Sequence, residues 1–236
     1  MCTVSVIQCK YKIIVTSNRD EKTSRPAAIK PKVHALNKKK VIFPKDPRSG
    51  GSWFTVDDQA NIAVLLNGAE EKHDFKGGYR KSRGLILLDI IGSNSPLKFW
   101  EHIDLKNIEP FTIVLVDKTG LHELQWNGTN KKHSRLENDK HYIWSSATLY
   151  SKTTKEKREQ WFKDFTKDTK NISPKEILDF HQETQIGDQE NGLQINRQNL
   201  TKTLSITQCV VQKNMIKINY LDLNERQSHN HTCFII

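Results

Sequence analysis

The chain has 236 residues, of which 36% are hydrophobic, and a formal net charge of +10. This length is enough to bury one sizeable core, and we expect a single domain over residues 1–236. Recurring apolar runs exclude a disordered protein, and none reaches the roughly 20 residues that a membrane-spanning helix requires. The N-terminus lacks a secretory signal pattern, so we expect a cytoplasmic protein with no membrane span.

The positive charge does not by itself indicate nucleic acid as a partner. Lysines are spread along the chain, and neither an RNA-binding sheet signature nor a helix-turn-helix pattern accompanies them. We expect a solvated basic surface. The cysteines show neither a C-x-x-C pair nor metal-ligand spacing, and His229 and His231 lack further clustered ligands. Free thiols and no metal site are therefore expected at Cys2, Cys9, Cys209 and Cys233.

The N-terminal region predicts a β-hairpin. Residues 2–8 and 11–17 both favour extended structure, and the short segment between them suits a turn. The strands would place the start of the chain inside a sheet, although most termini fray. The polar stretch "NRDEKTSRP" predicts an exit from the second strand, and Pro26 and Pro31 exclude a helix in the segment that follows.

The middle of the chain alternates hairpins and helices. "SWFTV" and "IAVLLN" predict two strands joined by the turn "DDQAN". Apolar spacing over residues 82–91 predicts a buried helix that ends at Gly92, and "SP" opens a shorter helix over 95–103. Residues 111–128 predict a strand, a D-K-T-G turn and a second strand, and "KHYIWSSA" predicts one more.

The last third predicts two helices followed by strands. Residues 153–168 form an amphipathic pattern, with Trp161, Phe162 and Phe165 on one side and charged residues on the other. A second helix is expected over 173–181 and a loop over 187–199. "TLSITQCVV" and "MIKINYLDL" predict a hairpin, and "TCFII" a closing strand. With strands at both ends and helices in two middle groups, the order predicts an α+β layered domain.

Cys2 is the residue whose chemistry is most informative. If Met1 is removed, Cys2 carries both a thiol and an α-amine, whose ordinary pKa near 7.7–8.0 lets it accept the thiol proton. A nearby arginine would stabilise the thiolate, and amide or backbone donors would hold an oxyanion. Position alone favours an ordinary strand residue instead.

The order of several motifs favours a functional role for Cys2 over that of an ordinary strand residue. "MCTVSVI", "TSNRDEKTSRPA", "SGGSWFTV" and "NIAVLLN" occur at suitable distances, and "KSRGLIL", "PFTIVLVD" and "WNG" follow. Together they resemble the NRDE family, also called the transport-and-Golgi-organisation family, over nearly the whole chain. The motif that names the family stands here as Asn18, Arg19, Asp20 and Glu21.

The resemblance implies a fold like that of the N-terminal nucleophile hydrolases. That fold is a four-layer αββα sandwich, in which two mostly antiparallel sheets lie between helices. It is also distantly similar to the choloylglycine hydrolases, which are cysteine amidases. Carried over, the catalytic positions are Cys2, Arg19, Asp20 and Asn67.

Positions for substrate binding follow from the same resemblance, at Asn18, Glu21, Ser146 and Lys202. Two of them depart from the usual pattern, since Ser146 stands where an asparagine is usual and Lys202 where an arginine is usual. A serine hydroxyl is shorter than an amide, and lysine lacks the planar fork of arginine. Both changes put efficient hydrolysis in doubt.

Each candidate also has a simpler reading. Arg19, Asp20 and Glu21 could form a charged network at a strand end, and Asn67 before Gly68 is a typical turn pair. Gly50 and Gly51 suit backbone conformation, and Trp53 suits the core.

Two functions are consistent with the resemblance. The first is a cysteine N-terminal nucleophile hydrolase that cleaves a linear amide or another acyl bond and requires no cofactor. The alternative is a non-enzymatic protein that binds or traffics haem or an acyl ligand on the same scaffold, because eukaryotic relatives are linked to haem trafficking and acyl-CoA homeostasis. The partner is a small molecule in both cases, and nucleic acid is the weakest reading.

Overall fold

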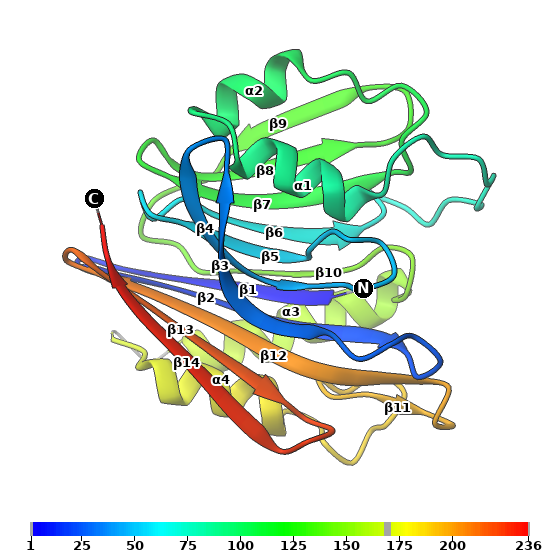
Figure 1. Ribbon diagram of the computed structural model, residues 1–236. Coiled ribbons are helices and arrows are strands. Elements are labelled where there is room, and N and C mark those ends of the chain that lie inside the picture. Colours follow the sequence, from blue (N-terminus) through cyan, green and yellow to red (C-terminus); the bar gives the residue numbers. More distant parts are fainter. Residues whose placement is uncertain (1, 168–170, 236) are drawn as a thin grey trace. The chain divides into compact units, whose positions relative to one another are not determined.

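The computed structural model describes residues 2–167 and 171–235, and these fall into two compact units. The first unit takes in the chain up to Arg25 and then Asp139–Phe234, and the second is built from Pro26–Asn138. Within the described residues, each unit contains one seven-stranded antiparallel sheet and two helices (Figure 1). The predicted α+β class with two antiparallel sheets is confirmed.

The first unit holds the N-terminal hairpin and the C-terminal strands. Its sheet has the order β10-β1-β2-β12-β13-β14, and β11 pairs with β12. The element bounds are β1 Cys2–Cys9, β2 Lys12–Lys22, β10 Tyr142–Ser145, α3 Lys152–Thr166, α4 Pro174–Glu183, β11 Asn196–Arg197, β12 Thr201–Gln212, β13 Met215–Asp222 and β14 Gln227–Phe234.

The NRDE tetrapeptide lies inside β2, so its prediction as a polar exit was wrong. β2 pairs with β1 on one side and with β12 on the other, and the β12 pairing continues to Lys22. Backbone hydrogen bonds to two neighbours keep these residues extended in spite of their polarity. Successive side chains of the motif therefore point to opposite faces of the sheet.

Helices α3 and α4 cover one face of this sheet. Phe162 from α3 and Phe180 from α4 pack with Ile7 and Ile14 of the first hairpin in one buried cluster. The predicted aromatic side of the first helix is confirmed, and the charged side needs one correction. Arg158 was expected among exposed charges, but it is fully buried beneath α3, four residues before Phe162. Residue 168, the predicted end of this helix, lies outside the described residues.

The second unit is a meander of consecutive hairpins, with α1 and α2 on one face of its sheet. The two predicted helices are confirmed, with Ser82 capping α1 through a hydrogen bond to the Leu85 N–H and with Gly92 at its C-cap. The element bounds are β3 Ile29–Leu36, β4 Lys39–Lys45, β5 Phe54–Asp57, β6 Ile62–Asn67, α1 Arg83–Ile91, α2 Pro96–His102, β7 Phe111–Asp117, β8 Gly120–Trp126 and β9 Lys131–Arg135.

A close backbone approach fixes α1 in the second unit. A side-chain carbon built on Gly51 would lie 2.7 Å from the Leu85 nitrogen, and one on Gly84 would lie 2.8 Å from the Ser52 carbonyl oxygen. The Ser52 N–H donates to the Gly84 carbonyl at 3.3 Å. Only glycine leaves room for this contact, which gives the "GGSW" stretch a structural role.

Several strands were not predicted, and two of them, β3 and β9, carry mostly polar residues. β3 and β4 form a hairpin between Pro26 and Gly50, and β9 pairs with β8. β3 and β9 are edge strands with largely exposed side chains, so they show little of the alternation that marks a half-buried strand. β14 likewise begins at Gln227, before the predicted "TCFII", whose last residue, Ile236, lies outside the described residues.

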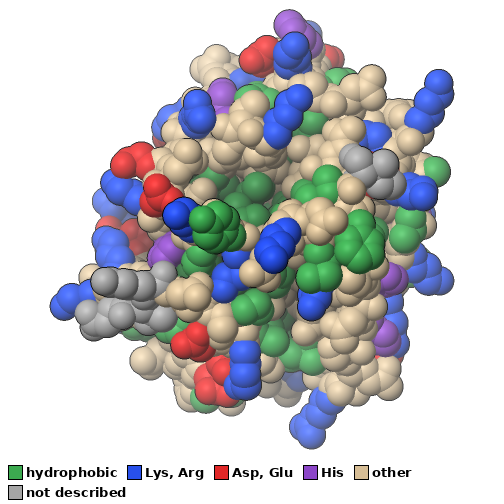
Figure 2. Space-filling view, turned by 90° about the vertical axis from the view of Figure 1, so that its left-hand side faces the viewer, with side chains coloured by type: hydrophobic (Ala, Val, Ile, Leu, Met, Phe, Trp, Pro, Cys, Tyr) green, Lys and Arg blue, Asp and Glu red, His purple; other side chains and the backbone are tan. Residues whose placement is uncertain are grey.

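Lysine and arginine side chains are scattered over the face shown in Figure 2, with neutral side chains between them. This agrees with a solvated basic surface on that face. Among the described residues, no helix is both long enough and apolar enough to cross a membrane.

A buried chain of hydrogen bonds ties α4 to the first sheet. The Asn18 amide donates to the carbonyls of His181 (3.1 Å) and Leu193 (2.7 Å). Its oxygen lies 2.6 Å from His181 Nδ1, so this ring nitrogen carries the proton. His181 Nε2 then accepts from the Ser5 hydroxyl at 2.7 Å. Burial, helped by the charge of Arg158, lowers the pKa of His181 to about 3.

From the low pKa of His181 we predict a specific loss of stability in acid. Its pKa is lower in the folded chain than the ordinary value near 6.5, so below pH 6.5 the unfolded chain binds a proton that the folded chain refuses. The contribution is complete above pH 6.5 and is lost as the pH falls toward 3, by at most about 1.4 kcal/mol per pH unit. Denaturant unfolding between pH 7 and 4 should show this slope, and His181→Gln should reduce it.

The control is His102→Gln, a change at an exposed position of α2. If wild type and His181→Gln lose stability in parallel over this range, His181 is not held neutral in the folded protein.

Candidate active site

The register of the first hairpin places the predicted nucleophile and arginine together. Cys2 is directly opposite Arg19 across the β1–β2 ladder. The next strand continues the row, because Arg19 is opposite Ser205 of β12. Residues directly opposite in an antiparallel pair are separated by only about 5 Å between their β-carbons. Arg19 is 3% exposed, so its guanidinium lies inside the protein at the start of β1.

Asp20 is fully buried and receives two short hydrogen bonds. The Tyr150 hydroxyl donates to Oδ2 at 2.5 Å, and the Thr203 hydroxyl donates to Oδ1 at 2.6 Å. Burial raises the pKa of the Asp20 carboxyl, while the charge of Arg158 and the two hydroxyl groups lower it. The carboxyl group is therefore held in one orientation from both sides.

A β-bulge makes the second of these contacts. Thr203 pairs with Asp20 and Ser205 pairs with Arg19, so Leu204 has no partner on β2. The extra residue shifts the register between the two pairs and brings Thr203 opposite Asp20. Thr203 is itself fixed, since its hydroxyl accepts from the Ile195 N–H at 2.9 Å.

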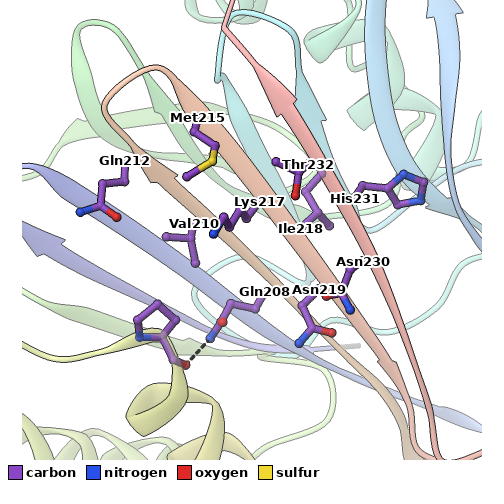
Figure 3. A pocket seen from close by; sticks show the side chains of 11 residues that line it. Gln208, Val210, Gln212, Met215, Lys217, Ile218, Asn219, Asn230, His231 and Thr232 are labelled. Atoms are coloured by element: carbon purple, nitrogen blue, oxygen red, sulfur yellow. Dashed lines mark hydrogen bonds between the residues drawn. The ribbon is translucent and has the colours of Figure 1, made fainter.

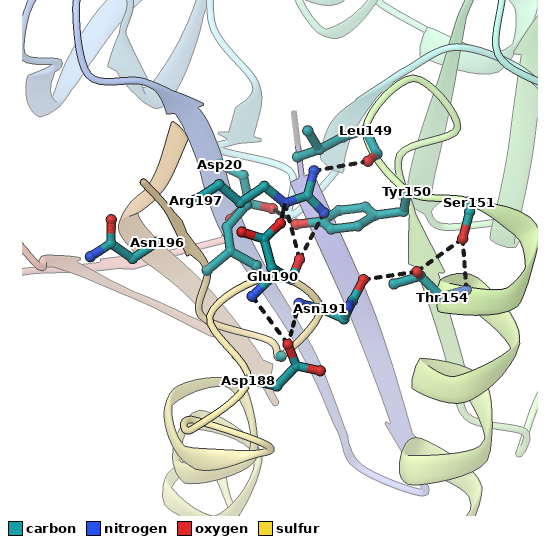
Figure 4. Close-up of polar contacts among 12 residues, drawn as sticks. Asp20, Leu149, Tyr150, Ser151, Thr154, Asp188, Glu190, Asn191, Asn196 and Arg197 are labelled. Carbon is teal, nitrogen blue, oxygen red and sulfur yellow. Dashed lines mark hydrogen bonds and ion pairs between the residues drawn. The ribbon is translucent and has the colours of Figure 1, made fainter. Parts of the chain in front are cut away.

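Tyr150 joins Asp20 to two arginines. The guanidinium of Arg158 lies 3.7 Å from the centre of the Tyr150 ring, and that of Arg197 lies 5.4 Å from it. Both distances are within the range of cation–π contact. Arg197 also donates to the carbonyls of Glu190 (2.8 and 3.0 Å) and Leu149 (3.3 Å), which fastens the loop before β11 to this cluster (Figure 4).

Ser146 lies next to Cys2 on the side of β1 that pairs with β10, opposite the side that pairs with β2. β10 pairs with β1 up to Ser145 and Thr3, so the next position on each strand is Ser146 and Cys2. Ser146 is fully buried, and its hydroxyl lies 3.2 Å from that of Thr148. Its carbonyl accepts from the Tyr150 N–H at 3.1 Å. The same turn therefore holds Ser146 and Tyr150.

Glu21 and Lys202 lie farther along the same strands. They are directly opposite each other across β2 and β12. Glu21 also forms an ion pair with Arg25 at 3.7 Å. Opposite charges at facing positions favour this register, and the Glu21–Lys202 pair is next to the Asp20–Thr203 pair along the ladder.

The remaining predicted residues are placed differently. Asn18 is fully buried, and the contacts described above engage both its amide nitrogen and its oxygen. Asn67 ends β6 in the second unit, opposite Phe111, and is partly buried. The structure thus gathers seven of the eight predicted residues in the first unit, and the part of Asn67 in the site stays a prediction.

Four residues of this cluster were missed by the sequence analysis: Tyr150, Arg158, Arg197 and Thr203. Arg158 left a signal, because Thr154, Arg158 and Phe162 recur every four residues and are all buried. Because arginine is charged, we expected Arg158 on the exposed side of the helix instead. Tyr150 and Thr203 left none, since their role depends on contacts with residues more than a hundred positions away.

A separate groove of about 420 Å³ runs along β12, β13 and β14 (Figure 3). Carboxamide side chains line it from three strands, and the Gln208 amide donates to the Pro174 carbonyl at 2.9 Å. None of the predicted site residues lines this groove.

Comparisons with known proteins agree with this architecture. A solved structure of similar fold is the Caenorhabditis elegans N-acylethanolamine-hydrolyzing acid amidase ortholog. Its TM-score is 0.65 at 13% identity, and the likeness covers 88% of this chain and 92% of that one.

Two variants of the Clostridium perfringens conjugated bile acid hydrolase are also similar, one with alanine in place of a cysteine and one with leucine in place of an arginine. Their TM-scores are 0.54 and 0.53 at 12% identity, over 98% and 99% of this chain and 96% and 98% of those chains. At such identities the likeness shows the fold, which confirms the predicted N-terminal nucleophile hydrolase type.

No curated protein has a significant sequence match to the chain. A family model described as Transport and Golgi organisation 2, in contrast, matches residues 1–227. The match spans nearly all of the sequence and both units, so the chain belongs to the Transport and Golgi organisation 2 family.

Proposed function

We propose that the protein is a cysteine N-terminal nucleophile hydrolase that cleaves a linear amide or another acyl bond. The observation that carries the proposal is the ladder register that sets Cys2 opposite Arg19, beside an Asp20 carboxyl held by two hydroxyl groups. The fold supports it as well, because the similar structures bear the names of an acid amidase and a bile acid hydrolase.

The reaction requires a free α-amine on Cys2, so the proposal includes removal of Met1. The amine takes the thiol proton, and the sulfur attacks the carbonyl carbon of the substrate. When the tetrahedral intermediate collapses, the bond to the leaving group breaks and the amine returns the proton to that group. Water then attacks the thioester, releases the acid and restores the thiol.

The neighbouring residues divide the remaining tasks. The Arg19 guanidinium stabilises the thiolate, since a positive charge beside a cysteine favours its ionised form. Asp20 orients the amine, and a backbone N–H holds the oxyanion, while a part for Asn67 in this step stays a prediction. Ser146 and Lys202 bind the substrate beside this centre, whereas the fully engaged Asn18 acts by fixing β2.

An electrophilic acyl probe tests the nucleophile. After incubation near pH 7, intact-mass analysis should show one acyl group on the wild-type chain and none on Cys2→Ala. Cys9→Ala is the matched control, because it removes a partly buried thiol from the other end of the same strand. Burial raises the pKa of the Cys209 thiol, so that residue should not compete. Equal labelling of Cys2→Ala and wild type would contradict the proposal.

The alternative function, binding or trafficking of haem or an acyl ligand without catalysis, has one observation in its favour. Ser146 replaces the usual asparagine, and its hydroxyl lies within hydrogen-bonding distance of Thr148, so this position offers no side-chain amide to an oxyanion. In that case the protein would retain a binding site at this position but would not catalyse hydrolysis.

Ligand titration separates the two functions. A carrier should bind haem or an acyl-CoA saturably at micromolar concentration, with equal affinity in wild type and Cys2→Ala, and should leave the thioester of the acyl-CoA intact. Release of free CoA by wild type but not by Cys2→Ala supports the hydrolase. Absence of saturable binding by either ligand would rule out the carrier.

A further inference from the structure

Tyr150 lies where four elements of the first unit meet. Its hydroxyl donates to Asp20 of β2, and its backbone N–H donates to the carbonyl of Ser146, just after β10. Its ring contacts Arg158 of α3 and Arg197 of β11. Only 3% of the tyrosine is exposed, so these contacts leave it one position.

Arg158 connects this tyrosine back to the first strand. The guanidinium lies over the Tyr150 ring and donates to the Thr3 hydroxyl, next to Cys2 in sequence. It also donates to the carbonyls of Asn191 and Gly192. A fully buried guanidinium is costly unless its donors are satisfied, so these partners fix its plane and, through stacking, that of the ring.

The charges around Asp20 determine what the tyrosine can do. Burial and the nearby Asp20 charge raise the pKa of Tyr150 well above its ordinary value, so the hydroxyl stays protonated and donates. Burial also favours the neutral form of Asp20, and the Arg158 charge and the hydroxyls of Thr203 and Tyr150 oppose it. The Arg158 charge and the two hydroxyl groups therefore limit the rise in the Asp20 pKa and favour the ionised form of its carboxyl.

We propose that Tyr150 is a positioning residue of the candidate active site, which holds the Asp20 carboxylate in place and is itself held by Arg158 and Arg197. The inference rests on the proposed function for the identity of the site, and its geometry stands on the contacts above. It makes the Ser146–Tyr150 turn and the loop before β11 part of the catalytic architecture.

The direct test is a carbon-13 NMR titration of the Asp20 carboxyl, assigned by the loss of its signal in Asp20→Asn. Tyr150→Phe removes one oxygen and keeps the ring between the arginines. The titration midpoint of Asp20 should move upward by about one pH unit, since a hydrogen bond to a charged group is lost. Thr203→Val should move it in the same direction, and Thr203→Ser, which keeps the hydroxyl, should not.

The matched control is Tyr142→Phe, which removes a hydroxyl from β10, where the ring stacks on Trp144 at 5.7 Å. The other charged groups near Asp20 are the N-terminal amine, whose charge also lowers the Asp20 pKa, together with Arg19, Arg158, Arg197 with Glu190, and the Glu21–Lys202 pair. All of them remain in every variant. An unchanged Asp20 midpoint in Tyr150→Phe overturns the proposal. Should that variant fail to fold, the contrast between Thr203→Val and Thr203→Ser decides in its place.

The pH dependence of Cys2 alkylation by iodoacetamide then distinguishes a failure of the positioning role of Tyr150 from a failure of the proposed hydrolase function. In Tyr150→Phe the acid limb of the rate profile should move with the Asp20 midpoint, whereas in Tyr142→Phe it should coincide with wild type. A shifted midpoint together with an unreactive Cys2 would support the positioning role and contradict the hydrolase. A reactive Cys2 whose profile is the same in Tyr150→Phe as in wild type would contradict the positioning role alone.

Discussion

The candidate active site depends on one constraint, the antiparallel register that joins β1, β2 and β12. This register sets Cys2 opposite Arg19 and Arg19 opposite Ser205, and the bulge at Leu204 brings Thr203 opposite Asp20. A slip of one residue would move every side chain to the other face of its strand. Buried residues on both faces of β1 oppose such a slip, because all positions from Thr3 to Ile7 are inaccessible to solvent.

Alternation along β2 divides the NRDE motif between two tasks. Asn18 and Asp20 point to the face that carries α3 and α4, where they bond to His181 and Tyr150. Arg19 and Glu21, one residue out of phase, point to the opposite face. The motif thus combines anchors that fix the strand, among them the Asp20 carboxyl of the proposed site, with the Arg19 charge on the other face. Because a buried polar group is stable only when it is bonded, the anchors also specify a single packing of the two helices.

The sequence was sufficient for the parts of the structure that depend on local pattern. The first hairpin, the helices and the C-terminal strands follow from periodicity and caps, and the order of motifs predicts the family. It was insufficient where long-range contacts decide. Polar β3 and β9 are strands because neighbours pair with them, and Arg158 is buried because Tyr150 and distant carbonyls satisfy it. Asn18 is identified as an anchor only once His181 and Leu193 lie beside it.

The central claim is that Cys2 acts as nucleophile and base in one residue, and the N-terminus of the mature protein tests it most directly. Intact-mass and N-terminal peptide analysis of protein isolated from cells should show a chain that begins at Cys2 with a free α-amine. A chain that keeps Met1 would contradict the account, because the amine of Cys2 would then be an amide nitrogen that accepts no proton.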